Sequence, residues 1–347
     1  MTPVLLVGGF PPPHGGISVH VQALFEALRA RGRSVRVLDV GSGKPPQPGV
    51  VPVRSAAALA SALAAHAAAG WLVHVHVSGH TPKSWMVALA GSLARRPFGP
   101  APVLTVHSGL VPLFAAQGRA QRALVGRVAS AYGRVVAVNE TVAGALQACG
   151  VRASRIAVVP AFAGADLRAE PPAGLAALRF DFAPLVSCAV APSPIYGLRV
   201  LLPALRLASL RRPSLGAALF GPEGTRPGRI EEAAKAGGLS GRVHYLGELG
   251  HAGALAVMAA SDVFVRPTLA DGDALSVREA LSLGVPVVAS AVGFRPPGVR
   301  LFRVGDERGL AEAIEAALVA ERPAPVPPTG LEALLELYGE EGARAAG

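Results

Sequence analysis

The stretch Asp262–Gly298, DVFVRPTLADGDALSVREALSLGVPVVASAVGFRPPG, constrains the fold more than any other part of the chain. It contains two short apolar runs, DVFVRP and VPVVAS, of the kind found in buried parallel strands. Between them we predict a helix over Ser276–Leu283, because Ser276 and Glu279 have the spacing of a capping box and Gly284 supplies a stop. This order of strand, loop, helix and strand indicates an α/β domain with a parallel sheet.

The loop before this helix is the candidate ligand site. In open α/β sheets, ligands bind where the carboxyl end of a strand passes into the N-terminus of a helix. The free amides that follow Gly272 favour a phosphate group there. Asp271 lies in the loop and Glu279 in the first helical turn, eight positions apart. This arrangement suits an anionic, hydroxyl-rich ligand such as a nucleotide sugar.

The same alternation of strands and helices extends over the whole chain. One series of apolar runs begins with PVLLVGG and ends with RIAVVP, and a second begins with APLVSCAV. The first series includes one long expected helix, Leu113–Tyr132. Between the two series, Ala161–Pro184 loses its periodicity and contains Pro171-Pro172, so we place a linker there. The sequence therefore predicts two Rossmann-like domains with parallel sheets, residues 1–165 and 180–325.

Composition narrows the class of protein. Hydrophobic residues make up 51% of the chain, but the most Ala-rich segment, Ala56–Val77, is interrupted by polar residues and predicts helix, turn and strand, not a membrane span. The chain begins directly with a strand pattern and lacks a signal-peptide layout. Cys149 and Cys188 have no ligand or redox spacing, so we interpret both as buried thiols in a reducing cytoplasm. No zinc spacing or aromatic-plus-basic pattern indicates nucleic-acid binding.

The net charge of +10 is unevenly distributed. Residues 1–170 hold 16 Lys and Arg against 5 Asp and Glu, whereas residues 171–347 hold 17 against 18. A codon bias that favours arginine would explain the excess. The alternative is an anionic partner for the first half, either a bilayer surface or a lipid diphosphate. Each basic residue near an anionic membrane contributes on the order of 1 kcal/mol, so a few would suffice for peripheral attachment.

Several of these runs resemble the family 4 glycosyltransferases, which are retaining enzymes of the GT-B fold. The acid-x7-acid motif of that family corresponds to Asp271-x7-Glu279, with Asp in place of the more usual first Glu. The opening GGFPPPHGGISVHVQALFEAL and the run RVVAVNETVAGALQACGVRASRIAVVPAF are similar to the family's first domain. The variant RPTLADGDALSVREALSLGVPVVAS resembles a bacterial branch associated with cell-surface polysaccharides. The resemblance covers nearly the whole chain and implies that a final helix, within 329–347, crosses back onto the first domain.

The resemblance assigns roles around the loop of the second domain. It implies that Glu279 holds the ribose hydroxyls of the donor and that Asp271 faces the sugar. The alternatives are purely structural roles: a capping carboxylate for Glu279 and a solvated turn residue for Asp271. The backbone amides of the next four residues are the expected contacts of the pyrophosphate and the sugar, namely Gly272, Asp273, Ala274 and Leu275.

The chain departs from the family at Val190–Gly197, VAPSPIYG. Many members have an Arg and a Lys here to neutralise the leaving diphosphate, but this chain has Ala191 and Tyr196 at those places. Departure of a nucleoside diphosphate develops negative charge, so the loss of two cations matters. We hypothesise that the cations are relocated to nearby arginines, against the alternative that these are ordinary surface or ion-paired residues. The candidates are Arg266, Arg278 and Arg295.

The first domain supplies further candidates: two donor-binding glycines, a catalytic histidine and weaker acceptor contacts. Gly15 and Gly16 open the first helix, where the family's backbone approaches the donor phosphate or the sugar; a flexible turn is the alternative. The run HVHVSGH places His74 and His76 on one strand face. By resemblance, His107 contacts the transferred sugar, and a hydrogen-bonded strand-end histidine is the alternative. Weaker candidates for acceptor contacts are His80, Lys83 and His14.

The sequence therefore predicts a retaining transfer of sugar from a nucleotide-sugar donor to a glycan or polyprenyl-linked acceptor. The first domain shows no evident carboxylate nucleophile, which fits front-face transfer. Asp271-Gly272-Asp273 matches the short D-x-D metal pattern, but it opens a helix late in the second domain, so we expect no metal and no other cofactor. Two alternatives stay open: a homologue that binds nucleotide sugars without turnover, and an epimerase or hydrolase of the same fold.

Overall fold

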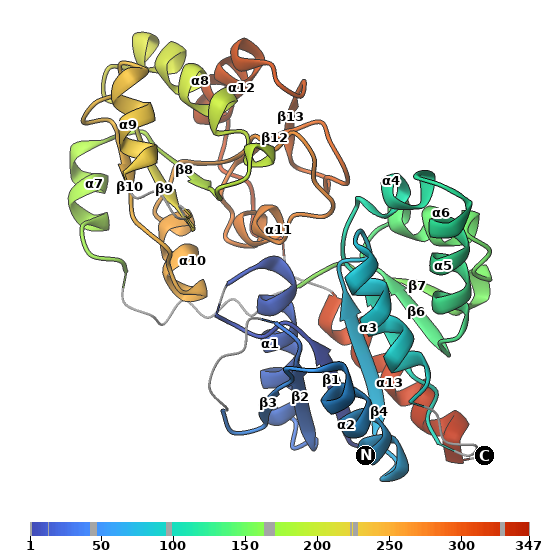
Figure 1. The fold of residues 1–347 in the computed structure, drawn as a ribbon. Helices are drawn as coiled ribbons and strands as arrows, with labels where there is room; N and C mark the ends of the chain where they lie inside the picture. The colour runs from blue at the N-terminus through green and yellow to red at the C-terminus, as the bar shows by residue number, and fades with distance from the viewer. Residues whose placement is uncertain are drawn as a thin grey trace. The chain divides into compact units, whose positions relative to one another are not determined.

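The structure is a computed structural model, and it divides into two compact units (Figure 1). Unit 1 comprises Met1–Ala163 and Thr329–Gly347, and unit 2 comprises Gly164–Pro328. Each unit is built on one parallel sheet, as the sequence predicts. The residues described are 2–12, 14–41, 47–94, 99–162, 171–222, 224, 228–326 and 330–346, with side chains described up to residue 339.

The sheet of unit 1 has seven parallel strands in the order β3-β2-β1-β4-β5-β6-β7. The order reverses at β1, where β4 pairs with the strand that began the series, and this is the switch point at which such sheets bind ligands. The central strands are buried on both faces, which is why their sequences are continuous apolar runs. The strands are β1 Val4–Gly8, β2 Val35–Asp39, β3 Val50–Pro52, β4 Leu72–Val77, β5 Val103–Val106, β6 Arg134–Ala137 and β7 Ile156–Val158.

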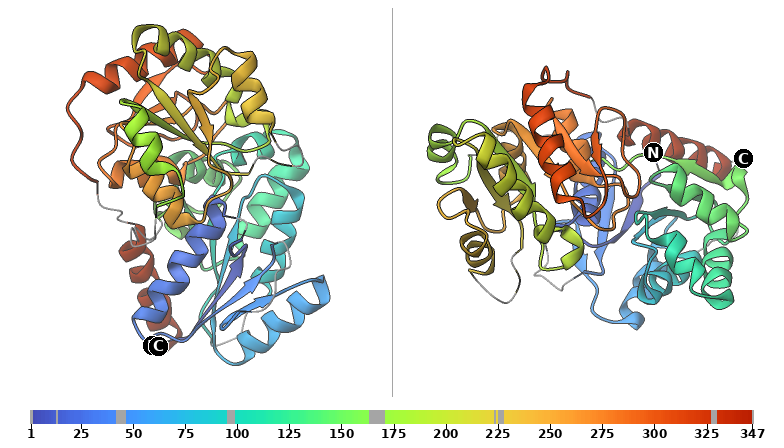
Figure 2. Two further views of the ribbon diagram at one scale, coloured as in Figure 1. Left: turned by 90° about the vertical axis from the view of Figure 1, so that its left-hand side faces the viewer. Right: turned by 90° about the horizontal axis from the view of Figure 1, so that it is seen from above.

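Two helices far apart in the sequence share one core with this sheet. Leu24 and Leu28 of α1 (Gly16–Ala30) belong to the same buried cluster as Leu334 and Tyr338 of α13 (Gly330–Ala346). The left view of Figure 2 shows the two helices next to each other, and Arg31, directly after α1, bonds to Glu332 of α13. The other helices of unit 1 are α2 Ala56–Ala68, α3 Pro82–Ser92, α4 Val111–Ala116, α5 Arg119–Ser130 and α6 Glu140–Ala148, with a 3-10 turn at Ala153–Arg155.

Three expectations from the sequence are wrong in detail. Leu113–Tyr132 is not one helix, because the chain breaks between α4 and α5 at Gly118, whose backbone is extended. The predicted linker contains a helix, α7 (Leu175–Asp181), which buries Leu175 in the core of unit 2. The linker residues 163–170 lie outside the described part. Of the two free thiols, Cys188 is buried, but Cys149 is only half-buried.

The sheet of unit 2 has six parallel strands in the order β10-β9-β8-β11-β12-β13. Helices α8, α9 and α12 pack on one face, and α7, α10 and α11 contribute to the core on the other. The strands are β8 Leu185–Ala189, β9 Gly216–Phe220, β10 Val243–Tyr245, β11 Val263–Arg266, β12 Val287–Ser290 and β13 Arg300–Phe302. The helices are α8 Leu198–Arg211, α9 Arg229–Ala236, α10 His251–Ala259, α11 Leu275–Ser282 and α12 Glu307–Val319, with a 3-10 turn at Pro194–Tyr196.

None of the described helices combines the length and the apolar character needed to cross a membrane.

Candidate active site

The candidate loop in unit 2 runs from the end of β11 to the start of α11. Helix α11 begins at Leu275 after Ala274, which offers no side-chain cap, and its first turn holds no acidic residue. The predicted capping box of Ser276 and Glu279 is therefore wrong, because the helix starts two residues earlier than Ser276 requires. The first amides of α11 have no side-chain partner from the cap, which is the arrangement that favours an anion.

Asp271 is held from four directions. One carboxylate oxygen, Oδ2, accepts from Nε of Arg266 at 3.0 Å, from the hydroxyl of Thr268 at 3.0 Å and from Nη2 of Arg295 at 3.1 Å. The other accepts from the amide of Gly272 at 3.0 Å. Burial raises the pKa of Asp271, but the two guanidinium groups and the Thr268 hydroxyl outweigh it and lower the pKa to about 2. Asp271 is not a solvated turn residue.

Asp273 forms a second ion pair in the same loop. Arg278 donates two hydrogen bonds to its carboxylate, both at 2.7 Å, and the Asp273 side chain is fully buried. Burial raises the pKa of Asp273, and the bidentate bonds from Arg278 oppose that rise. Both acids of the short D-x-D match are thus occupied by arginines. This arrangement is unlike the open carboxylate pair that a Mg²⁺ ion requires.

A neighbouring loop fixes the backbone of these acids. The amide of Phe294 donates to the carbonyl oxygen of Gly272 at 2.8 Å. Gly293 has a positive φ of 66°, and a Cβ there would lie 2.5 Å from the carbonyl oxygen of Asp271. Only glycine fits this approach without displacement, so the loop geometry depends on Gly293.

The three candidate arginines all lie at this loop, and each is paired with Asp271 or Asp273. Arg266 and Arg295 are mostly buried, at 11% and 4% side-chain exposure, whereas Arg278 is 20% exposed. The guanidinium of Arg266 also lies over the ring of Tyr196, 4.8 Å from its centroid. By resemblance, Tyr196 stands where many members of the family carry a Lys. Arg266 therefore lies beside the position at which the hypothesis places a relocated cation.

The segment around Tyr196 packs directly on the end of β11. The amide of Leu269 donates to the carbonyl oxygen of Ile195 at 2.8 Å. Gly197 has a φ of 73°, and a Cβ there would lie 1.9 Å from the carbonyl oxygen of Pro267. This contact holds the start of α8 against the residues that carry Arg266.

Glu279 lies in the second turn of α11 and has a partner that the sequence reasoning missed. Its Oε1 lies 2.6 Å from Nε2 of His251, the first residue of α10. The Glu279 side chain is 11% exposed. The pairing joins residues 28 positions apart, so no local sequence pattern could have indicated it. Their proximity could be expected only if the starts of α10 and α11 were known to be adjacent.

In unit 1, the donor-binding candidates Gly15 and Gly16 and the three acceptor candidates lie around the starts of two helices. Gly15 and Gly16 are exposed at the beginning of α1, where the hydroxyl of Ser18 accepts from the amide of Gly15 at 2.9 Å. A Cβ on Gly15 would meet only ordinary contacts, so its position does not demand glycine. His14 precedes this helix and is half-buried. His80 and Lys83 lie around the start of α3, His80 half-buried and Lys83 exposed.

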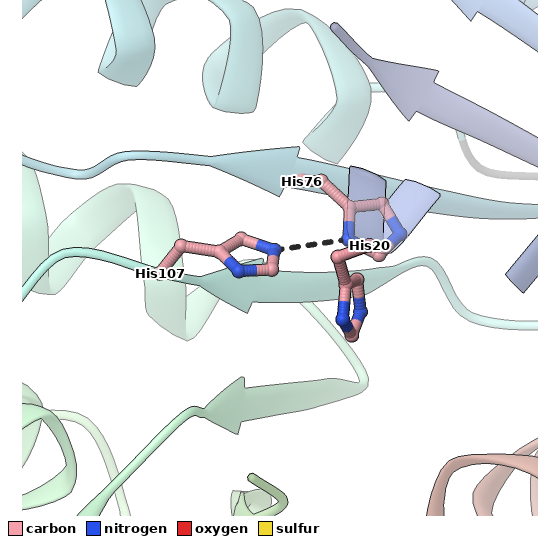
Figure 3. A group of neighbouring side chains, drawn as sticks. All are labelled: His20, His76 and His107. Carbon is pink, nitrogen blue, oxygen red and sulfur yellow. Dashed lines mark hydrogen bonds between the residues drawn. The ribbon is translucent and has the colours of Figure 1, made fainter. Parts of the chain in front are cut away.

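His107 lies in a cluster of four histidines on the α1 and α13 face of the sheet. It follows β5, and its Nε2 lies 3.2 Å from Nδ1 of His76 on β4 (Figure 3). The ring of His20, from α1, lies 4.9 Å from that of His107. His74 is deeper and bonds to the hydroxyls of Thr105 and Tyr338. His74 and His76 share one strand face, as the sequence predicts.

Burial makes these histidines weak bases. It lowers the pKa of His20 to about 4 and that of His74 to about 3. Burial and the neighbouring rings lower the pKa values of His76 and His107 well below the usual range. The cluster is therefore uncharged at neutral pH and can donate or accept hydrogen bonds as neutral imidazole. The sequence reasoning missed His20, although it lies four positions before Leu24 on the buried stripe of α1.

In a comparison with known protein families, one family model matches each unit. A model described as glycosyl transferase 4-like domain matches residues 15–161, and one described as glycosyl transferases group 1 matches residues 185–319. Together they span most of the chain and assign it to the glycosyltransferases of the GT-B fold. The comparison with curated proteins found no match by sequence.

Solved structures with the same fold cover the entire chain. HepE from Anabaena, in complex with UDP and glucose, is 19% identical, with a TM-score of 0.66 over 100% of this chain and 98% of its own. The sucrose-phosphate synthase of Thermosynechococcus elongatus is 21% identical, with a TM-score of 0.71 over 100% and 94%. A proposed UDP-N-acetylglucosamine 2-epimerase from Listeria monocytogenes is 16% identical, with a TM-score of 0.66 over 99% of both chains. At these identities the likeness shows the fold.

Proposed function

We propose that this protein transfers a sugar, with retention, from a nucleoside diphosphate sugar to a glycan or lipid-linked glycan acceptor during the synthesis of cell-surface polysaccharide. The observation that carries the proposal is the loop from Asp271 to Leu275. Its amides open α11 without a side-chain cap, and arginines surround it. HepE was solved with UDP, UDP and glucose, and UDP-glucose, which supports a nucleotide-sugar donor for a chain of the same fold.

In this proposal the loop of unit 2 binds the donor. The amides at the start of α11 bind the diphosphate, and Asp271 accepts hydrogen bonds from sugar hydroxyls. Glu279 holds the ribose hydroxyls with charge-assisted hydrogen bonds, and His251 orients its carboxylate. Arg266, beside Tyr196, supplies positive charge as the bond from the sugar carbon to the phosphate oxygen breaks.

We propose that the configuration of the sugar carbon is retained because transfer occurs from the front face. The acceptor hydroxyl attacks the sugar carbon from the side of the leaving group, and the departing phosphate oxygen takes the hydroxyl proton. Asp39, the buried acid among the described residues of unit 1, already accepts from the amides of Phe10 and Gly41 at 3.0 and 2.9 Å. Both amides bond to Oδ1, so one oxygen of this carboxylate is engaged by the backbone. A neutral His107 positions the transferred sugar by hydrogen bonding.

The test begins with a panel of nucleoside diphosphates and their sugars scored by thermal shift. The best donor is then assayed for diphosphate release with and without polyprenyl-linked glycan acceptors. Glu279→Gln is expected to weaken donor binding about tenfold or more, the scale of a charge-assisted hydrogen bond. Glu312→Gln, an exposed glutamate on α12, is the matched control and leaves binding unchanged.

Each alternative function predicts a different result in this assay. Donor binding without release, across all acceptors, would support the homologue without turnover. Release that proceeds equally without acceptor would support a hydrolase, and interconversion of the donor sugar would support an epimerase. Release that depends on the acceptor supports the transferase.

We also propose that unit 1 contacts an anionic membrane, where a lipid-linked acceptor resides. Helices α3 and α4 both pack against α5. Met86 of α3, Leu93 directly after α3 and Leu113 of α4 are 60%, 75% and 65% exposed. Arg119 and Arg122 are exposed on α5. Apolar residues near arginines suit the boundary between headgroups and acyl chains.

A further inference from the structure

Three histidines from separate elements converge at the carboxyl edge of the unit 1 sheet. They are His20 in α1, His76 in β4 and His107 after β5 (Figure 3). One ring nitrogen of each lies within 4.8 Å of a ring nitrogen of the other two. His20 and His76 are only 2% and 3% exposed. Buried polar groups normally have hydrogen-bond partners. A buried ring nitrogen of this cluster without a partner therefore indicates a missing ligand.

The hydrogen bonds of the cluster leave two buried nitrogens without a partner. Nδ1 of His20 lies 3.1 Å from the carbonyl oxygen of Phe162 and 3.3 Å from the amide nitrogen of the same residue. The shorter contact, to the carbonyl oxygen, favours the ring proton on Nδ1. Nε2 of His20 then carries the lone pair, and it is buried without a partner. Histidines that bind metals characteristically donate their other nitrogen to a carbonyl in this way. Nε2 of His76 is also buried and unpartnered, and it carries the ring proton when Nδ1, which faces His107, binds an ion.

The spacing between the other two rings fits a shared ion. Nδ1 of His76 and Nε2 of His107 are 3.2 Å apart. Two nitrogens bound at 2.0–2.1 Å to a tetrahedral zinc ion lie about 3.4 Å apart. Neutral imidazole is the form that binds transition metals.

We propose that His20, His76 and His107 form a binding site for a divalent transition-metal ion, of which zinc is the expected occupant. Three histidines leave the fourth position of a tetrahedral ion open. His74 is not a ligand, because Thr105 and Tyr338 engage both of its nitrogens. The site goes beyond the proposed transfer reaction. It also departs from the expectation of no metal, which concerned Asp271-Gly272-Asp273 and did not weigh histidines from three elements together.

The test measures metal binding and does not depend on enzyme activity. Tag-free protein is stripped with EDTA and titrated with Co²⁺, whose visible absorption reports tetrahedral coordination. We expect one ion per chain, displaced by Zn²⁺. His20→Gln and His76→Gln should each weaken binding roughly tenfold or more. The control His244→Gln, a histidine of unit 2, should bind as the wild type does.

A second measurement on the wild-type chain covers the case in which a variant fails to fold. Imidazole ¹⁵N spectra of the nine histidines are recorded during a Zn²⁺ titration. Movement of the resonances of His20, His76 and His107, with those of His74 unaffected, supports the site. Absence of Co²⁺ and Zn²⁺ binding, or binding retained by both cluster variants, overturns it. Zinc-induced shifts confined to the remaining histidines also overturn it.

Discussion

At the scale of single residues, the candidate donor loop is governed by the neutralisation of Asp271. Two arginines and a threonine converge on one carboxylate that is 11% exposed. Breaking such a buried pair on one side leaves an uncompensated charge, which is costly. The contribution of this cluster to the free energy of unfolding can be measured from the pH dependence of stability.

Asp271→Asn is expected to destabilise the protein by about 2 kcal/mol at pH 7. The folded pKa of about 2 lies below the unfolded value of 3.8, so this contribution is present above pH 3.8 and is lost as the pH falls from there toward 2. Urea unfolding of the variant and the wild type at pH 7 and pH 3 should show the difference shrinking. The exposed Asp181→Asn serves as control. Equal stability of Asp271→Asn and wild type at pH 7 would contradict the account.

Arg266 carries the hypothesis of relocated cations. Arg266→Ala should lower turnover about 100-fold and weaken nucleoside diphosphate binding, because a fixed charge beside the leaving group is lost. Arg266→Lys should recover part of the turnover. Arg278→Ala should have a smaller effect, since Asp273 engages two of its donors. The exposed Arg303→Ala is the control. Unchanged donor affinity and turnover in both Arg266→Ala and Arg278→Ala would show that relocation is wrong.

At the scale of elements, the sequence predicted the strands well and the helix starts less well. Apolar runs such as DVFVRP identify buried strands because both faces must be covered. The start of α11 was misplaced because Ser276 and Glu279 have the spacing of a capping box, while the loop is fixed by Gly293 and the arginines. These fixing contacts join segments distant in sequence, so no local pattern contains them.

The candidate site shows the same division. Asp271 and Glu279 could be located from one stretch of sequence, because the strand, loop and helix around them are local. Their partners Arg295 and His251 come from other loops, and His20 meets His107 only through tertiary packing. Single-sequence reasoning identifies such residues only when the order of strands in the sheet is already known.

The face formed by α3 and α4 should bind anionic vesicles. Sedimentation with anionic lipid at low salt is expected to recover the protein, and high salt should weaken the binding. Leu93→Ser and Leu113→Ser should each reduce the vesicle affinity roughly fivefold, the equivalent of about 1 kcal/mol of apolar burial. Leu210→Ser, on α8 of unit 2, removes a leucine of 74% exposure as a matched control. Failure to bind at either salt concentration would rule out the contact.

At the scale of the whole molecule, different titratable groups make the two units sensitive to acid. Unit 1 holds a cluster of four neutral histidines, three of them buried, whereas the acid-sensitive group of the candidate donor loop in unit 2 is Asp271. The folded pKa of His20, about 4, lies below the unfolded value of 6.5. The unfolded state therefore takes up more protons as the pH falls through this window, and stability is lost between pH 6.5 and 4.

This difference predicts that acid destabilises unit 1 before unit 2. Both tryptophans of the chain, Trp71 and Trp85, belong to unit 1, so their fluorescence follows that unit. In EDTA, the free energy of unfolding measured by fluorescence should fall by about 2 kcal/mol between pH 7 and pH 5 for His20 alone, and the urea midpoint should fall with it. Circular dichroism should then show a second transition at higher urea from unit 2, whose Asp271 stays ionised until below pH 4. His20→Gln should reduce the pH dependence of the fluorescence midpoint. A fluorescence midpoint constant from pH 7 to pH 5 would contradict the burial of neutral histidines as the source of acid sensitivity.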